Sequence, residues 1–327
     1  MKVLLTGASG FVGSHILDVL VERAIPTAIL LRPTSNRQFV QRHLGCVEVR
    51  PGSINDLKSL EKALADATHV IHCAGCTKAR RNSDFYEVNE TGTRNMVAAL
   101  NLRNGAIQQF LHISSLAVAG PATAERPATE LDAPNPISEY GRSKLAAELE
   151  VRNHCRTVYT ILRPPAVYGP RDSGFFAMFN AVHRHLLPRP NRRQILSLVY
   201  AKDLAQAVVN CLGHPGAAGK AYFVASRERV SASGMAQQIA GTMGGWTLPC
   251  PLPAAALWPV CLAQEIFGRL TGRAMLLNMQ KYSELRAPGW VCEPSLFEKE
   301  IGFRCETPLK QGISEALEWY RKEGWLP

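Results

Sequence analysis

Short apolar runs alternate with helix-like stretches through the first half of the chain. The apolar runs predict strands, which cover residues 2–6, 26–32, 46–50, 69–73, 109–115 and 158–163. The apolar spacing between them predicts helices over 11–23, 56–65, 84–103 and 138–153. Alternating strands and helices are typical of a parallel sheet with right-handed crossovers. We therefore expect an α/β fold, a Rossmann-type doubly wound parallel sheet.

The regularity loosens after Gly169-Pro170, where Pro, Gly and His become frequent. We expect residues 1–170 to form a dinucleotide-binding domain, to which 195–225 returns. Residues 171–194 and 226–327 would form a smaller, mostly helical substrate-binding lobe. Near the end of the chain, apolar residues at helical spacing predict a closing helix over 308–320.

Composition indicates a folded protein, because 46% of the residues are hydrophobic and 20% are charged. The formal net charge is +10, from 37 Lys and Arg against 27 Asp and Glu. Such a surplus raises nucleic acid, anionic membranes and acidic small molecules as partners. The basic residues are scattered and no nucleic-acid motif accompanies them, so we predict no nucleic-acid partner.

The start of the chain and the cysteines point to a cytoplasmic protein. The first apolar run breaks at Gly7, too early for a secretory signal. Nine cysteines, an odd number without a framework pattern, favour reduced thiols. Cys73 and Cys76 lack a second pair, and the histidines lack ligand spacing, so we predict no metal site.

A glycine-rich segment lies between the first strand and the first helix. Its candidate cofactor contacts are Gly7, Ser9, Gly10, Phe11, Val12 and Gly13. Glycines at this junction let the backbone approach a pyrophosphate, which the N–H groups of the helix start would bind. We therefore predict a dinucleotide site, although tight turns also use glycine.

The second strand ends at Arg32, where an acidic residue would indicate NAD. Arg32 and Arg37, with Ser35 and Asn36, could instead bind a 2′-phosphate. We therefore favour NADP(H) as the cofactor. NAD(H) stays open as an alternative, because a solvated arginine is also common at a strand end.

The candidate catalytic group combines Tyr140 and Lys144 with Ser115. Tyr140 and Lys144 are four residues apart, so they share one helical face. A nearby ammonium favours the phenolate of a tyrosine, whose free pKa is about 10. Ser115 ends the predicted fifth strand, at the edge where such sheets bind ligands. We expect Ser115 to hold a substrate oxygen while Tyr140 transfers the proton.

These motifs together resemble the extended, epimerase-like branch of the short-chain dehydrogenase/reductase superfamily. Further similar segments are Val70–Gly75, Tyr86–Thr93 and Leu162–Pro170. The resemblance implies a catalytic role for Asn89 and adds cofactor contacts at Ser53, Ile54, Cys73, Ala74, Gly75, Tyr140, Lys144, Pro164, Ala166 and Val167. One departure is Gly52-Ser53, since the family usually has Gly-Asp there; an adenine contact would have to come from Ser53.

The substrate prediction rests on two apolar features. Leu196 stands where relatives acting on nucleotide sugars usually carry an arginine, although Arg192 and Arg193 lie nearby. The stretch 246–270 offers a proline-broken apolar helix over 254–270, with Gln264, Glu265 and Arg269 on its wetter side. The order of segments in the second lobe, from Gly219–Phe223 through this stretch to Trp290–Cys292 and Ile301–Phe303, resembles the 3β-hydroxysteroid dehydrogenase-like group, including decarboxylating sterol-4-carboxylate 3-dehydrogenases.

We therefore expect hydride transfer between the nicotinamide and a secondary alcohol or ketone of a hydrophobic substrate. The resemblance favours a 3β-hydroxysteroid or a 4-carboxysterol oxidised at C3, where loss of CO₂ can follow. Three alternatives stay open: a nucleotide-sugar 4-epimerase or dehydratase, a dihydroflavonol-reductase-like ketone reductase, and a non-catalytic cofactor-sensing protein.

A basic cluster raises contact with a membrane surface. It comprises His183, Arg184, His185, Arg189, Arg192 and Arg193. Four prolines in 246–263 argue against a spanning helix. The cluster would meet a substrate carboxylate or the anionic inner face of the membrane, or it is only a solvated surface. A homodimer is compatible with the sequence.

Overall fold

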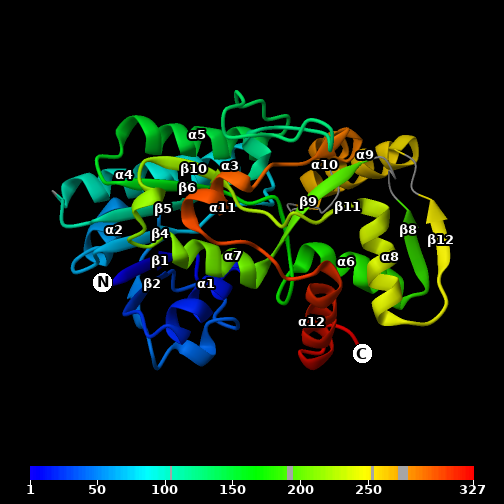
Figure 1. Cartoon of the computed structure of the whole chain (residues 1–327), viewed down its shortest axis with the longest axis horizontal. Helices are drawn as coiled ribbons and strands as arrows, with labels where there is room; N and C mark the ends of the chain where they lie inside the picture. The colour runs from blue at the N-terminus through cyan, green and yellow to red at the C-terminus, as the bar shows by residue number, and fades with distance from the viewer. Residues whose placement is uncertain (104, 190–193, 252–253, 272–278) are drawn as a thin grey trace.

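A computed structural model describes residues 1–103, 105–189, 194–251, 254–271 and 279–327. Its main sheet has seven parallel strands in the order β10-β6-β5-β4-β1-β2-β3 (Figure 1). The strands are β1 (Val3–Thr6), β2 (Thr27–Leu31), β3 (Glu48–Pro51), β4 (His69–His72), β5 (Gln109–Ile113), β6 (Tyr159–Arg163) and β10 (Lys220–Phe223). This order, which reverses beside β1, confirms the Rossmann-type doubly wound sheet.

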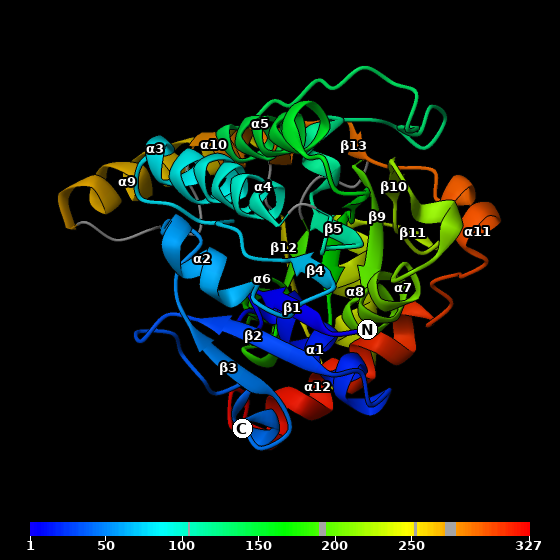
Figure 2. The same ribbon diagram turned by 90° about the vertical axis from the view of Figure 1, so that its left-hand side faces the viewer.

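Helices cover both faces of this sheet. Helices α1 (Phe11–Glu22) and α7 (Ala201–Asn210) pack together on one face. The other face carries α2 (Leu57–Ala63), α4 (Gly92–Leu102) and α5 (Glu139–His154), and Figure 2 shows these layers from the end of the molecule. Such a buried sheet needs apolar side chains on both faces of each strand, as the short apolar runs predict.

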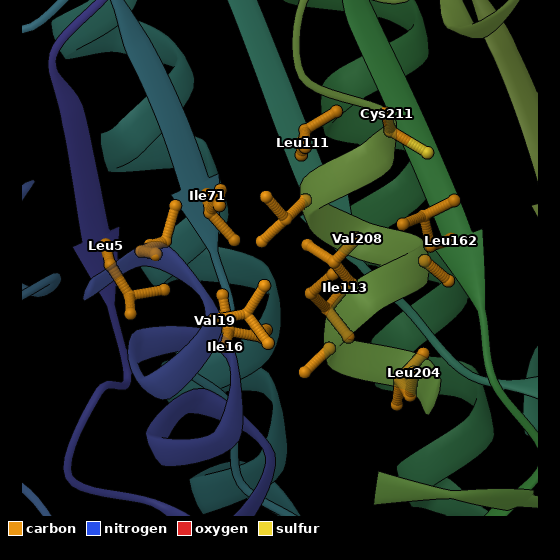
Figure 3. Packing of buried hydrophobic residues seen from close by; sticks show 14 of the residues in the cluster. Leu5, Ile16, Val19, Ile71, Leu111, Ile113, Leu162, Leu204, Val208 and Cys211 are labelled. Carbon is orange, nitrogen blue, oxygen red and sulfur yellow. The ribbon is translucent and has the colours of Figure 1, made fainter. Parts of the chain in front are cut away.

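Side chains of successive strand residues enter opposite layers. Leu5 and Ile71 belong to the core between the sheet and helices α1 and α7, whereas Leu4 and Val70 belong to the core on the other face. Figure 3 shows Leu5, Ile71, Leu111 and Ile113 pointing from the strands towards Ile16, Val19, Leu204 and Val208 of the two helices. This packing fixes the carboxyl ends of β1, β4 and β5, where the predicted site lies.

The second lobe contains sheets as well as helices. Strand β9 (Ile195–Tyr200) pairs with β7 (Ala166–Tyr168), β11 (Arg229–Ser231) and β13 (Gly289–Trp290), and β8 (Leu186–Arg189) pairs with β12 (Leu248–Pro251). The helices are α6 (Ser173–His183), α8 (Ala232–Met243), α9 (Ala254–Thr271), α10 (Met279–Arg286), α11 (Ser295–Ile301) and α12 (Leu309–Lys322). No helix among the described residues is long and apolar enough to cross a membrane.

The predicted division into lobes needs two corrections. Of the returning segment 195–225, α7 and β10 join the first lobe, but β9 belongs to the smaller sheet. In the other direction, Phe297 and Ile301 of α11 are buried in the core that α1 and α7 share. The chain therefore crosses between the lobes more often than composition indicates.

The helix predicted over 84–103 is also divided. It comprises α3 (Asn82–Tyr86), a π-helical turn over Glu87–Thr91, and α4. A π-turn inserts an extra residue into a helix, and such turns are frequent at functional sites. Here the turn carries Asn89, which is buried.

Candidate functional site

The glycine loop folds tightly between β1 and α1. Gly7 has φ +76°, and a Cβ there would lie 2.6 Å from the backbone nitrogen of Ala74. A Cβ on Gly13 would lie 2.1 Å from the carbonyl oxygen of Gly7. Gly10 is exposed and caps α1 without a side-chain hydrogen bond. The first N–H groups of α1 therefore meet no side-chain cap, which fits a dinucleotide pyrophosphate.

The remaining predicted residues of this loop surround the helix start. Ser9, Phe11 and Val12 are half-buried. The Gly10 N–H donates to the Gly7 carbonyl oxygen at 3.0 Å and closes the turn. The sequence motif and the folded loop agree in position.

The loop after β4 lies directly against the glycine loop. The Ala74 N–H donates to Thr6 Oγ1 at 3.2 Å, and Gly75 is exposed. Cys73 is half-buried, and burial raises the pKa of its thiol to about 12. A protonated thiol is a poor metal ligand or nucleophile. Among the described residues no His, Cys, Asp or Glu group could hold a metal ion, and none of the nine cysteines forms a disulfide.

Asn89 holds this loop to α5. Its Oδ1 accepts from the Cys76 N–H at 2.7 Å, and its Nδ2 donates to the Cys76 carbonyl at 3.0 Å. The same Nδ2 donates to Ser143 Oγ at 2.9 Å. Asn89 therefore uses its amide to position the backbone of this loop against α5.

Ser115 and Tyr140 meet at the carboxyl edge of the sheet. Ser138 caps α5 by accepting from the Gly141 N–H at 3.2 Å, which places Tyr140 in the first turn. Burial raises the pKa of Tyr140 to about 12, while a hydrogen bond with Ser115 acts in the opposite direction. A phenol with this pKa is protonated at neutral pH.

Lys144 lies deeper, on the same helix. Its Nζ donates to the Ile113 carbonyl at 2.7 Å, and burial lowers its pKa to about 8. The sequence assigned the lowering of the Tyr140 pKa to Lys144. In the structure a hydrogen bond with Ser115 acts to lower the Tyr140 pKa, and the Lys144 ammonium donates to the carbonyl at the end of β5; an effect of Lys144 on Tyr140 stays a prediction.

A buried ion pair holds Ser114, the residue before Ser115. Ser114 Oγ donates to Glu148 Oε1 at 2.6 Å, and Arg163 donates to both carboxylate oxygens of Glu148 at 2.8 and 2.6 Å. The side chains of Glu148 and Arg163 are 0% and 4% exposed. The end of β5 is thus fastened to α5 and β6, although the sequence analysis did not identify this pair.

The other predicted cofactor contacts lie at strand ends. Arg32 and Arg37 are exposed beyond β2, and no salt bridge joins either of them to another described residue. Ser53 and Ile54 follow β3, where the Ser53 N–H donates to Ser59 Oγ at 3.0 Å. No carboxylate stands at the end of β2, as the sequence predicts.

The segment after β6 completes this edge. The Pro164 carbonyl accepts from the Leu116 N–H at 2.8 Å, next to Ser115. Ala166 is exposed and Val167 is half-buried, both on β7. The structure therefore gathers nearly all predicted residues at the carboxyl ends of parallel strands, where open α/β sheets bind ligands.

Two residues near Tyr140 were missed by the sequence analysis. The ring of Phe85 lies 6.1 Å from that of Tyr140. Glu284 of α10 acts on Tyr140 through its negative charge, which raises the pKa of the phenol. No sequence motif links Glu284 to a tyrosine 144 positions earlier; only the folding of α10 over the site brings them together.

A hollow of about 300 Å³ opens between α10 and the loop before α5. Its lining comprises Pro121, Ile137, Tyr282, Ser283, Arg286 and Ala287. Ile137 lies three residues before Tyr140 in the chain, and Tyr282, Ser283 and Arg286 belong to α10, which also carries Glu284.

Leu196 is half-buried and packs in the core of the second lobe. It lies on β9, where it pairs with Val230 and Trp290. Arg192 and Arg193 lie outside the described residues. In the structure an apolar side chain therefore occupies the position at which the sequence analysis looked for an arginine.

Comparisons with known proteins agree with this geometry. The sequence model of the NAD dependent epimerase/dehydratase family matches residues 3–225. A ceramide reductase of Caulobacter vibrioides (strain NA1000 / CB15N) is 28% identical over 326 residues, 99% of this chain and 96% of its own. A UDP-glucose 4-epimerase of Vibrio cholerae is 27% identical over 85% of this chain and 84% of its own. The crystal structure of gox2253 is similar with a TM-score of 0.80 and 25% identity, covering 100% of this chain and 99% of that one.

Proposed function

Because this chain belongs to the NAD dependent epimerase/dehydratase family, we propose that it is an NADP(H)-dependent oxidoreductase acting on a hydrophobic ketone or alcohol. The observation that carries this proposal is the meeting of Ser115 and Tyr140 beside the glycine loop, with an apolar Leu196 in the second lobe. The family is an enzyme family of nicotinamide chemistry, and this chain retains the side chains for that chemistry.

The cofactor would lie across the carboxyl edge of the main sheet. The start of α1 would bind the pyrophosphate, and Arg32 and Arg37 the 2′-phosphate. Lys144 would bind a ribose. The adenine side would meet Ser53 and Ile54, and the nicotinamide side Cys73–Gly75 and the segment from Pro164 to Val167. When bound, the cofactor supplies or accepts the hydride at C4 of its nicotinamide.

Tyr140 and Ser115 would handle the substrate oxygen. In reduction, a carbonyl carbon gains a hydride and its oxygen gains a proton, which Tyr140 would donate. A Tyr140 pKa of about 12 keeps the phenol protonated at neutral pH, which suits a proton donor. Ser115 would donate a hydrogen bond to the same oxygen. Solvent would then restore the proton of Tyr140.

We propose an amphipathic lipid as the substrate class. The hollow between α10 and the loop before α5 combines apolar Pro121, Ile137 and Ala287 with polar Tyr282 and Arg286. The match to a ceramide reductase extends over nearly the whole chain, including the second lobe. A ceramide-like lipid is therefore the first candidate, and the 3β-hydroxysteroid or 4-carboxysterol expected from the sequence is the second.

A nucleotide-sugar epimerase is the competing function. The similarity to a UDP-glucose 4-epimerase over 85% of this chain supports it. Leu196 counts against it, because an apolar side chain cannot bind a diphosphate. A dihydroflavonol-type reductase would use the same catalytic group, whereas a cofactor sensor would not need Ser115, Tyr140 and Lys144 together.

A substrate panel separates these functions. Purified protein is incubated with NADPH or NADH and with detergent-dispersed ceramide-type ketones, 3-ketosteroids, dihydroflavonols or UDP-sugars. The proposal predicts NADPH oxidation with a lipid ketone. Epimerisation of a UDP-sugar without net consumption of cofactor would replace it with the competing function.

A further inference from the structure

The outward face of α9 is apolar. Val260, Ala263, Ile266 and Phe267 share one side of the helix and are exposed, with 43% of Val260 and 51% each of Ile266 and Phe267 accessible. Trp258, on the same helix, is 47% exposed. We call Val260, Ala263, Ile266 and Phe267 the α9 face. Soluble helices normally present polar residues outward, so this face indicates a binding surface.

The polar residues of α9 point inward instead. Gln264 and Glu265 are half-buried, and Glu265 Oε2 accepts from the Met279 N–H of α10 at 3.1 Å. The sequence placed both residues on the wetter side, which is wrong for them; the side chain of Arg269, the third, is not among those described. Because α9 packs on α10 through its polar side, its apolar side faces solvent.

A second apolar group lies at the same end of the molecule, on the β8–β12 ribbon (Figure 1). Trp246 and Leu248 are 68% and 61% exposed, and Leu248 pairs with the exposed Leu186. The ring of His185 stacks on Trp246 at 4.2 Å. Since β12 ends at Pro251 and α9 begins at Ala254, the ribbon leads directly into α9.

The net positive charge concentrates in the same segments. Residues 173–200 and 230–292 contain eight Lys and Arg but only two acids, Glu265 and Glu284. Arg184 and Arg286 are exposed among the described residues, whereas Arg192 and Arg193 lie outside them. These two segments alone therefore carry a net charge of +6 of the +10 of the whole chain.

We propose that the α9 face docks the second lobe on an anionic lipid bilayer. Apolar side chains that include tryptophan, next to basic residues, are typical of helices lying in a membrane interface. A second copy of this chain is a poorer occupant, because it would bring two positively charged surfaces together. Docking would bring the α10 side of the lobe, with the hollow that Tyr282 and Arg286 line, near membrane-borne substrates. The docking itself does not depend on the proposed function.

Flotation with lipid vesicles tests this directly. Full-length protein is mixed with vesicles of phosphatidylcholine alone or with phosphatidylglycerol added. We expect binding to the mixed vesicles only, weakening with salt. Ile266→Ser with Phe267→Ser should lower the partition coefficient about tenfold. The matched control is Leu102→Ser, an exposed leucine (60%) at the far end of the molecule, which should bind like the unaltered protein.

Charge reversal provides the second arm. Arg184→Glu should weaken binding about tenfold, whereas Lys62→Glu on α2 should have little effect. Thermal melting checks that each variant is folded. Equal binding to both vesicle types, or equal effects of the α9 and Leu102 variants, would overturn the proposal. A dimer in buffer that the α9 variant dissociates would assign the face to a second copy instead. Turnover of a detergent-dispersed substrate, measured in parallel, distinguishes failure of membrane docking from failure of the proposed function.

Discussion

The side-chain amide of Asn89 forms hydrogen bonds with both backbone polar groups of Cys76. It accepts from the Cys76 N–H at 2.7 Å and donates to the Cys76 carbonyl at 3.0 Å. The π-turn that carries Asn89 allows this reach from a helix to the loop after β4. Because that loop lies against the glycine loop, the shape of the predicted cofactor site depends on one buried amide.

Asn89→Ala should therefore impair cofactor binding before chemistry. Loss of the amide removes the partner of the Cys76 N–H and carbonyl, at a cost of about 1–3 kcal/mol, whereas Ser143 Oγ keeps its bond to the Tyr140 carbonyl at 2.8 Å. We expect a lower melting temperature and a higher Kd for NADPH. Asn55→Ala is the control, since the Asn55 side-chain amide donates to exposed Glu87 at 3.2 Å and its loss should change little. A normal cofactor Kd in Asn89→Ala would contradict the positioning role.

The ion pair of Glu148 and Arg163 should contribute strongly to stability. Glu148→Gln leaves the guanidinium of Arg163, 4% exposed, facing a neutral amide, which should cost about 3–5 kcal/mol. Urea unfolding measures this loss. Glu150→Gln, two residues along the same helix, weakens only contacts with the exposed side chains of Arg94 (50% exposed) and His154 (65% exposed), and should cost under about 1 kcal/mol. Equal losses of unfolding free energy in the two variants would contradict a larger contribution of the buried pair to stability.

Arg32 should decide the preference between the two cofactors. Arg32→Glu removes the candidate 2′-phosphate contact and supplies a carboxylate for a ribose hydroxyl. The Kd for NADPH should rise about tenfold or more, while the Kd for NADH should stay similar or fall. Lys62→Glu controls for the change in net charge. If the unaltered protein binds NADH more tightly than NADPH, the assignment of Arg32 is wrong.

Three buried histidines should make the fold sensitive to acid. Burial lowers the pKa of His15 to about 4, that of His72 to about 3 and that of His112 well below 6.5. Neither ring nitrogen of His112 bonds to a residue that the structure describes. The unfolded chain takes up these protons from about pH 6.5 downward while the folded chain does not, so stability present above pH 6.5 falls as the pH decreases.

At pH 5, His15 and His72 should each lower the free energy of unfolding by about 2 kcal/mol relative to pH 7. Urea unfolding at both pH values measures the difference. His15→Gln keeps a donor for the Pro170 carbonyl, which His15 meets at 2.9 Å, but cannot titrate, so it should reduce the difference. An unchanged free energy between pH 7 and pH 5 would contradict these pKa values.

Much of the first lobe could be predicted from the sequence, because its signals are local. The strand runs, the turn at Gly7 and the spacing of Tyr140 and Lys144 all depend on neighbouring residues. The cap on α5 and the order of the sheet then bring Ser115 to Tyr140. Long-range geometry decided the rest: the π-turn at Asn89 and the return of α11 to the first core have no local pattern.

The electrostatics of the site also required the fold. Spacing on one helix predicts that Lys144 and Tyr140 share a face, whereas the bond from the Lys144 ammonium to the Ile113 carbonyl depends on the packing of α5 against β5. Periodicity predicted the amphipathic α9, but only its packing on α10 determines which side faces solvent. A periodic pattern gives the two faces of a helix without stating which one is covered.

The most direct test of the catalytic assignment is the turnover of a lipid ketone by Tyr140→Phe with NADPH. The phenyl ring preserves the contact with Phe85 but cannot donate a proton, so kcat should fall about a hundredfold or more while NADPH still binds. Tyr86→Phe, which removes a hydroxyl bonded to Glu139 at 2.8 Å, should retain turnover. Undiminished turnover by Tyr140→Phe, with Tyr86→Phe equally active, would contradict the account.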